Sequence, residues 1–289
     1  MKILKYSINF IISFLIVFAI IFVIGVNFLN NKILNKDYVI SKLEESEFYL
    51  QISREVESGF ENYIYQSGFP EDTVKNIFTE EMIKNDVNSL INYLYDGTEI
   101  NLSTDLLRQN LETKIQEYVN SENIILSEQN TKNINKFEDL IVNEYSKNIN
   151  VSNTLYEKGN SIIQKLESVS SKLGNLPVII LIVLVAILII INIKDLLVAI
   201  NFAGISLLTV GVVLKLGISL ILKNIEIDNL MIITKSLSNL AKCIIKECLY
   251  QLSEYWNIFV VCGIVGILVF AILKNTDEKK EKPKRRFAN

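Results

Sequence analysis

Four long hydrophobic runs alternate with polar segments along the chain. They cover residues 8–29, 177–193, 196–222 and 257–273. A hydrocarbon core about 30 Å thick requires roughly 17–25 apolar residues in a helix, so each run is long enough to cross a membrane. The pattern predicts an all-α integral membrane protein with four transmembrane helices. One large polar block, residues 30–176, lies between the first helix and the second.

Hydrophobic positions within the polar block recur at helical spacing, with hardly any strand alternation. The clearest stripe lies between Thr79, a predicted N-cap, and Gly97, a predicted C-cap, and comprises Ile83, Val87, Leu90, Ile91 and Leu94. Ser103 or Thr104 is expected to cap a further helix, which carries on one face Leu107, Leu111, Ile115 and Val119. We expect one helical domain with a modest core of its own.

Two other stretches of the block also have helical periodicity. A helix pair is predicted from Asp37 onward, broken near Ser46 and ended by Gly68. Beyond residue 131, one long helix or two lead to the second hydrophobic run, with Gly159 as a weak point. Its apolar positions are Ile134, Phe137, Ile141, Leu155, Ile162, Leu166, Val169 and Leu173.

The segment before the last run, residues 223–256, predicts an amphipathic helix with Asp228 as its candidate N-cap. Its apolar stripe comprises Leu230, Ile233, Leu237, Leu240, Ala241, Ile244, Ile245, Cys248, Leu249 and Leu252. Trp256 follows at the level of the membrane interface, where aromatic rings are enriched. The helix either lies on the outer leaflet or packs beneath the outer domain, and we favour these structural roles over a lid or a partner groove.

The distribution of lysine and arginine predicts the orientation, because cytoplasmic segments next to spans are enriched in both. A basic tail, residues 274–289, follows the last run, and Lys2 and Lys5 precede the first. Both termini are therefore expected in the cytoplasm of a multi-pass cell-membrane protein. Residues 30–176 and 223–256 then face outward, and residues 177–222 form a hairpin of two spans. The first run, residues 1–29 with its flank, is expected to be an uncleaved anchor, because it exceeds the core of a signal peptide.

The composition argues against catalysis and against cofactors. The chain contains no histidine, which removes the commonest general base and metal ligand. Cys243 and Cys248 point about 140° apart on one helix, so no disulfide is expected between them. Neighbouring carboxylates such as Glu138 and Asp139 are expected on solvated faces, and tyrosines such as Tyr65 at the edge of the core. A net charge of −3 does not favour a nucleic-acid partner.

Candidate contacts to lipid or to a protein partner lie on the amphipathic helix and the tail; they are Lys242, Lys246, Trp256, Lys284, Arg285 and Arg286. Lys215 is the one charge within a span, and we expect its ammonium to reach the outer interface along its own stem. Small residues in the last two spans predict close helix packing; they are Ala199, Ala203, Gly204, Gly211, Gly217, Cys262 and Gly266.

Two resemblances bear on the function. Residues 89–111, SLINYLYDGTEINLSTDLLRQNL, are similar to uncharacterised four-span membrane proteins of low-GC Gram-positive bacteria. That resemblance implies a bacterial membrane protein and no known activity. One anchor, a large outer domain and three further spans resemble the layout of FtsX- and MacB-type permeases, which implies a cytoplasmic ATPase partner.

Three function classes follow. The leading hypothesis is a non-enzymatic protein whose outer helical domain binds or scaffolds an envelope partner. The alternative is a permease or export subunit that works with a cytoplasmic ATPase. The third is an enzyme acting on lipid or cell wall, for which only outward carboxylates and Lys242 or Lys246 are available.

Overall fold

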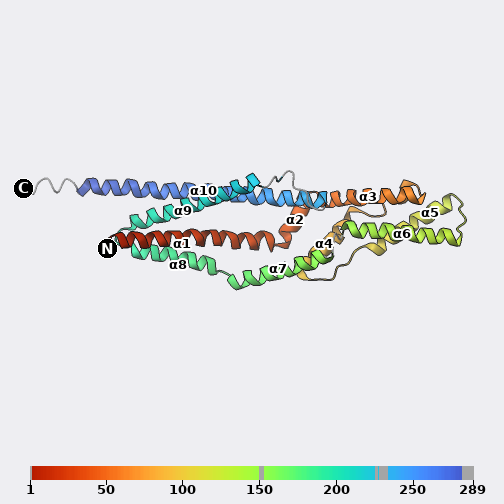
Figure 1. Ribbon diagram of the computed structural model, residues 1–289, viewed down its shortest axis with the longest axis horizontal. Coiled ribbons are helices and arrows are strands. Elements are labelled where there is room, and N and C mark those ends of the chain that lie inside the picture. The colour runs from red at the N-terminus through yellow and green to blue at the C-terminus, as the bar shows by residue number, and fades with distance from the viewer. Residues whose placement is uncertain (1, 150–152, 225–226, 228–233, 282–289) are drawn as a thin grey trace, which may run out of the picture. The chain divides into compact units, whose positions relative to one another are not determined.

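The computed structural model describes residues 2–149, 153–224, 227 and 234–281, and Figure 1 shows its helices. Every regular element in these ranges is helical, which confirms the all-α part of the predicted fold class. The elements are α1 (Lys2–Phe28), η1 (Leu29–Ile33), α2 (Lys36–Glu45), α3 (Phe48–Ser67), η2 (Glu71–Thr73), α4 (Glu80–Asp96), α5 (Thr104–Ser121), α6 (Glu128–Ile149), α7 (Asn153–Leu173), α8 (Leu176–Ile191), α9 (Leu196–Asn224) and α10 (Lys235–Glu281).

Four helical segments are long and apolar enough to cross a membrane. They are Ile3–Ile33, Tyr156–Ile191, Leu196–Asn224 and Lys235–Thr276, and they match the four predicted spans. The chain divides into two compact units. The apolar unit contains residues 1–31, 169–230 and 244–289, and the polar unit contains residues 32–168 and 231–243.

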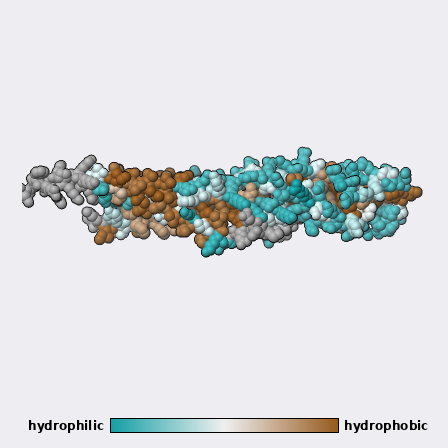
Figure 2. Space-filling view, turned by 90° about the horizontal axis from the view of Figure 1, so that it is seen from above, coloured by the Kyte–Doolittle hydropathy of each residue, from teal (hydrophilic) through white to brown (hydrophobic). Residues whose placement is uncertain are grey.

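In the apolar unit, α1 packs against α8 and α9. The buried residues at this packing are Ile12, Ile16, Val17, Ile20, Leu188, Val198, Ala199, Phe202 and Val210. Most of α8 remains exposed, and Figure 2 shows hydrophobic residues over the surface of this unit. An apolar exterior around a packed interior is what a helical bundle surrounded by lipid requires.

Two polar pairs lie inside the apolar unit, between α1 and its neighbours. The amides of Asn9 and Asn192 exchange two hydrogen bonds of 3.1 and 2.9 Å, and both side chains are buried. One turn further along α1, the hydroxyls of Ser13 and Ser206 lie 2.6 Å apart. Each pair satisfies its own polar groups, as hydrocarbon surroundings demand.

Glycines bring α9 and α10 close together. A Cβ atom at Gly263 would lie 2.8 Å from the carbonyl oxygen of Gly204, and one at Gly211 would lie 3.0 Å from the carbonyl oxygen of Trp256. Close packing at Gly204 and Gly211 is therefore confirmed. A Cβ atom at Gly217 would have nothing within 4 Å, so this glycine is not a packing site.

On the facing helix the predicted residue is wrong by one position. Cys262 is exposed, and Gly263 occupies the contact together with Gly266. A cysteine side chain at the contact would hold the backbones apart, whereas glycine allows them to meet.

The core of the polar unit is formed by α3, α4, α5 and α6. Its most completely buried side chains include Val56, Phe60, Ile77, Ile83, Leu107, Leu111, Ile141 and Tyr145. The predicted stripes on α4 and α5 supply Ile83, Leu90 and Leu107 to this core, as expected for amphipathic helices.

The helix ends in the polar unit follow the local chemistry. The Thr79 hydroxyl accepts a 3.1 Å hydrogen bond from the Met82 N–H, and Gly97 ends α4 at φ 69°. Gly68 ends α3 at φ 77°, and the chain breaks at Ser46, where Glu47 adopts φ 54°. All four predicted boundaries are confirmed, because each depends on residues adjacent in sequence.

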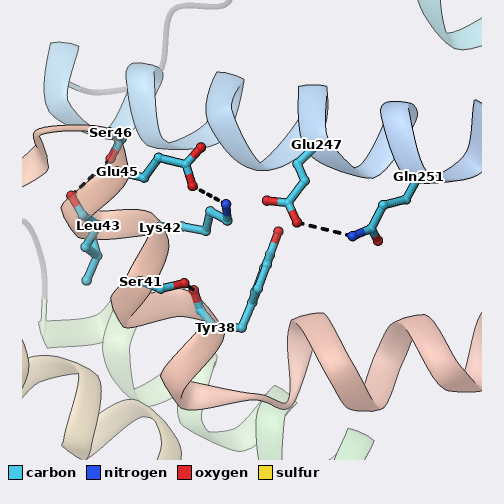
Figure 3. A network of polar contacts seen from close by, with 8 residues as sticks. All are labelled: Tyr38, Ser41, Lys42, Leu43, Glu45, Ser46, Glu247 and Gln251. Atoms are coloured by element: carbon cyan, nitrogen blue, oxygen red, sulfur yellow. Dashed lines mark hydrogen bonds and ion pairs between the residues drawn. The ribbon is translucent and has the colours of Figure 1, made fainter.

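Figure 3 shows the short-range polar contacts that fix α2. The Lys42 ammonium pairs with the Glu45 carboxylate one turn away. The hydroxyls of Ser41 and Ser46 donate to the carbonyl oxygens of Tyr38 and Leu43, at 2.7 and 3.3 Å. The same figure shows the Gln251 amide donating to the Glu247 carboxylate within α10, at 3.3 Å.

α10 differs from the prediction. Residues 223–256 and 257–273 were expected as an amphipathic helix and a separate span, yet a single helix runs from Lys235 to Glu281. The Thr234 hydroxyl accepts from the Leu237 N–H and caps its start. The candidate cap Asp228, and Leu230 and Ile233 of the stripe, lie outside the described residues. No proline or glycine interrupts residues 235–262, so nothing in the sequence stops the helix.

The first turns of α10 belong to the polar unit and pack on α3. Leu237 and Leu240 contact the hydrophobic core of that unit. The Ser236 N–H and hydroxyl both donate to the Glu55 carboxylate, at 3.1 and 2.9 Å. Of the two predicted placements, packing against the polar domain is the one observed for this part of the stripe.

The predicted apolar stripe of α7 is only partly buried, since Leu166 and Leu173 are half-buried and Val169 is exposed. Ile162 is 55% exposed, whereas Ile163 is buried. The Asn160 amide, one turn before Ile163, donates to the carbonyl oxygens of Tyr93 and Leu94 at the end of α4. Gly159, predicted as a weak point, lies against Leu94, where a Cβ atom would approach the Leu94 Cδ1 atom to 2.5 Å.

Candidate partner-binding surface

The described part of the chain contains no group of three or more histidine, cysteine, aspartate or glutamate side chains placed to hold a metal ion. None of the three cysteines forms a disulfide. Buried charges, an exposed hydrophobic loop and two hollows are the candidate functional features of the described residues.

The six predicted contact residues fall in different parts of the chain. Lys242 is half-buried in the polar unit, while Lys246 and Trp256 belong to the apolar unit. Lys284, Arg285 and Arg286 lie outside the described residues.

Trp256 does have a specific neighbour within the apolar unit. The Lys215 ammonium of α9 lies 4.5 Å from the centre of the Trp256 ring. A cation over an indole face is stabilised by the ring quadrupole. Both residues are predicted at a membrane interface, and in the structure the Trp256 ring is a partner of the Lys215 ammonium.

Asp86 is the most deeply buried carboxylate of the polar unit, at 1% exposure. It accepts from the Ser103 N–H at 3.0 Å, from the Ser103 hydroxyl at 2.6 Å and from the Tyr145 hydroxyl at 2.7 Å. Burial and this hydrogen bond raise the pKa of Tyr145, so its hydroxyl stays a donor. Ser103 is thus the N-cap residue of α5, but its side chain bonds Asp86 rather than the helix. These bonds join α4, α5 and α6.

Glu138 contradicts the expectation of a solvated carboxylate, because it is 5% exposed. Burial, and next the neighbouring Glu112 carboxylate, raise the pKa of Glu138, while Arg108 opposes the shift. The Arg108 guanidinium lies 3.6 Å from Glu138 but 2.6 Å from Asp139, so Asp139 takes the closer contact. The charge of Glu138 is only partly compensated.

The loop between α5 and α6 exposes three consecutive hydrophobic residues, Ile124, Ile125 and Leu126, and Ile125 is 92% exposed. Figure 2 shows a hydrophobic patch at the end of the polar unit where this loop lies. Asn123 adopts φ 52°, and the Ile124 N–H donates to the Val119 carbonyl oxygen at 2.9 Å. The Ser127 hydroxyl accepts from the Asn130 N–H and starts α6.

Both ends of the loop are therefore pinned by helix caps, and the hydrophobic residues are held outside. We call residues 124–126 the apolar loop. The sequence shows this short apolar run between Asn123 and Ser127. It does not show that the run is exposed, because the exposure depends on the geometry of the turn.

A hollow lies on each side of the apolar loop, and both share the walls Val119, Ile124, Leu126 and Ile134. The first, of about 450 Å³, has an aromatic lining of Tyr63, Phe69 and Phe137, and its one charged residue is Lys136. The second, of about 440 Å³, contains the carboxylates of Glu112 and Glu138 and the amides of Gln116, Asn120 and Asn135. We call them the aromatic hollow and the acidic hollow.

An exposed hydrophobic ridge between two hollows has the chemistry of a surface that a partner covers. Comparison with known proteins adds no further identification, since no family model, curated protein or solved structure matches the chain.

Proposed function

We propose that this chain is a multi-pass protein of a bacterial cell membrane whose polar unit binds a protein partner on the outer face, without catalysis. In this proposal both termini are cytoplasmic, and residues 30–176 are extracytoplasmic. The basic residues that follow the last span support this orientation. The four apolar helices provide the anchorage.

The apolar loop is the observation that carries the binding role. Ile124, Ile125 and Leu126 form a contiguous exposed apolar run next to two hollows, and a contiguous apolar patch, unlike a single exposed residue, marks an interaction site. The buried carboxylate of Asp86, by contrast, is saturated by donors from its own unit, which assigns it a structural task.

The alternative of a permease subunit is less well supported. An ATPase would have to grip the cytoplasmic link between α8 and α9, which consists of residues 192–195. Asn192 of this link is buried, and its amide bonds Asn9 and the Leu188 carbonyl oxygen. Only the three residues 193–195 of the link are exposed, which is a short segment for another protein to bind.

The binding role can be tested with a photo-crosslinking residue in the full-length chain in cells. Benzoylphenylalanine in place of Ile125 is expected to give a defined protein adduct. The matched control carries it in place of Glu61, which is exposed on α3 and outside both hollows. No adduct at Ile125, or equal adducts at both positions, would contradict the proposal.

The orientation has its own test. In a chain with its cysteines replaced by serine, Tyr65→Cys provides one thiol at a position that is 92% exposed. A membrane-impermeant maleimide is expected to label it in intact cells. Labelling only after lysis would invert the proposed orientation.

A further inference from the structure

We propose that the partner of the apolar loop is the same loop of a second copy of this chain, so that the surface forms a two-fold symmetric dimer contact. This inference rests on the proposed function, in which the apolar loop is a binding surface. It goes further by naming the occupant.

Charge complementarity between the two hollows points to self-association. Lys136 is the one charge that lines the aromatic hollow, and Glu112 and Glu138 are the charges that line the acidic hollow. Neither Lys136 nor Glu112 forms an ion pair among the described residues of this chain. Each hollow thus carries the charge that the other lacks.

The two-fold symmetry follows from the order of these features. The hollows lie on opposite sides of walls that they share, Ile124 and Leu126. In an isologous contact, residue i meets residue j and residue j meets residue i. A two-fold axis that runs along the apolar loop, between the two hollows, places the Lys136 of each copy against the Glu112 of the other, in two equivalent ion pairs.

The hydrophobic part of the surface fits the same arrangement. The symmetry axis brings the two Ile125 side chains together and removes both from water. The aromatic residues Tyr63, Phe69 and Phe137 line the hollow beside this contact and extend its apolar surface. A loop and two hollows form a small interface, so we expect a reversible dimer of chains held in one membrane rather than an obligate one.

The state of Glu138 adds support. Its carboxyl is buried, and this burial, followed by the neighbouring Glu112 carboxylate, raises the pKa of Glu138, while the Arg108 guanidinium at 3.6 Å opposes the shift. The Lys136 ammonium of a second copy supplies a positive charge next to the Glu112 and Glu138 carboxylates of the acidic hollow.

The test uses charge reversal in full-length chains with two different affinity tags, co-expressed and purified in lipid nanodiscs. Lys136→Glu and Glu112→Lys are each expected to lower recovery of the second tag roughly tenfold or more, because like charges then face one another. Co-expression of the two different variants is expected to restore recovery. Their mixed dimer contains one native Lys136–Glu112 pair and one reversed pair.

Two controls separate the contact from misfolding. Lys132→Glu makes the same charge change on α6 at an exposed residue outside both hollows, and recovery is expected to stay unchanged. Because each variant must recover when mixed with the other, neither can simply have lost its fold.

Unchanged recovery in Lys136→Glu, or failure of the mixed pair to recover, would overturn the self-association. The crosslinked adduct at Ile125 separates this inference from the proposed function. A second copy in the adduct supports both. A different protein in the adduct overturns the dimer and leaves the binding role standing, and no adduct at all overturns both.

Discussion

Replacing Asp86 should loosen the polar unit by an amount that its hydrogen bonds allow us to work out. Its carboxylate accepts from the Ser103 N–H, the Ser103 hydroxyl and the Tyr145 hydroxyl, and it is 1% exposed. A hydrogen bond to a charged group contributes about 1.5–3 kcal/mol, and a buried group left unpaired costs a similar amount. Asp86→Ala leaves three donors unpaired, so we expect a loss of about 3–6 kcal/mol.

Smaller changes in the same network should cost less, in a defined order. Asp86→Asn keeps one oxygen acceptor but turns an NH₂ group toward a donor, for a loss of about 2 kcal/mol. Tyr145→Phe removes a single 2.7 Å bond and leaves the Ser103 bonds in place, for about 1.5 kcal/mol. Combining both changes should cost less than the sum of the two, because they remove the same contact.

The assay is hydrogen exchange of the α4, α5 and α6 amides in the full-length protein. A loss of about 2 kcal/mol corresponds to exchange roughly 30-fold faster. Glu61→Gln, an exposed carboxylate on α3, is the control and should change the free energy of opening by less than about 0.5 kcal/mol. The network would not hold these helices together if the amides of the Asp86→Asn variant exchanged as slowly as those of the control. The same conclusion would follow if the effects of Asp86→Asn and Tyr145→Phe were additive.

Two further predictions concern helix packing and pH. Gly263→Ala should destabilise the contact of α9 with α10 by about 1–3 kcal/mol, because its methyl would meet the Gly204 carbonyl oxygen, whereas Gly217→Ala should be tolerated. Unfolding in detergent, followed by the fluorescence of the single tryptophan, measures both, and equal effects would refute the packing. The raised pKa of Glu138 means that the folded state holds its proton more tightly, so stability should fall as pH rises from about 4.3 through the raised value. Glu138→Gln should remove this part of the pH dependence of amide exchange on α6, and an unchanged pH profile would contradict it.

Local chemistry made much of the fold predictable from the sequence. Thr79 and Gly97 bracket α4 because a cap acts on backbone groups within one turn of itself. The boundary expected between the amphipathic helix and the last span does not exist, because residues 235–262 carry no helix breaker. A change from an amphipathic to a fully hydrophobic pattern indicates that the side chains meet different surroundings. It does not interrupt the backbone hydrogen bonds, so the helix continues.

The candidate surface was harder to predict for a different reason. Glu138 and Lys136 are two positions apart on α6, and the sequence indicates only that they face different ways. Their role depends on α5 and α3, which turn one side into an aromatic hollow and the other into an acidic one. The sequence likewise does not distinguish Ile125 from a core residue. Its exposure results from the turn at Asn123 and the cap at Ser127, which hold the loop outside the core.

The partners of the polar residues inside the apolar unit were likewise not predictable from the sequence. Asn9 and Ser13 are one turn apart, so they share a face of α1, but the sequence does not show that Asn192 and Ser206 face them. Each such hydrogen bond contributes only about 0.6–2 kcal/mol, less than the packing around it. The pairs fix the rotation of α1 about its own axis, because rotating the helix would separate the Asn9 and Asn192 amides and leave both without a partner among apolar side chains. They therefore specify which face of the first span meets α8 and α9, while the apolar residues supply most of the attraction.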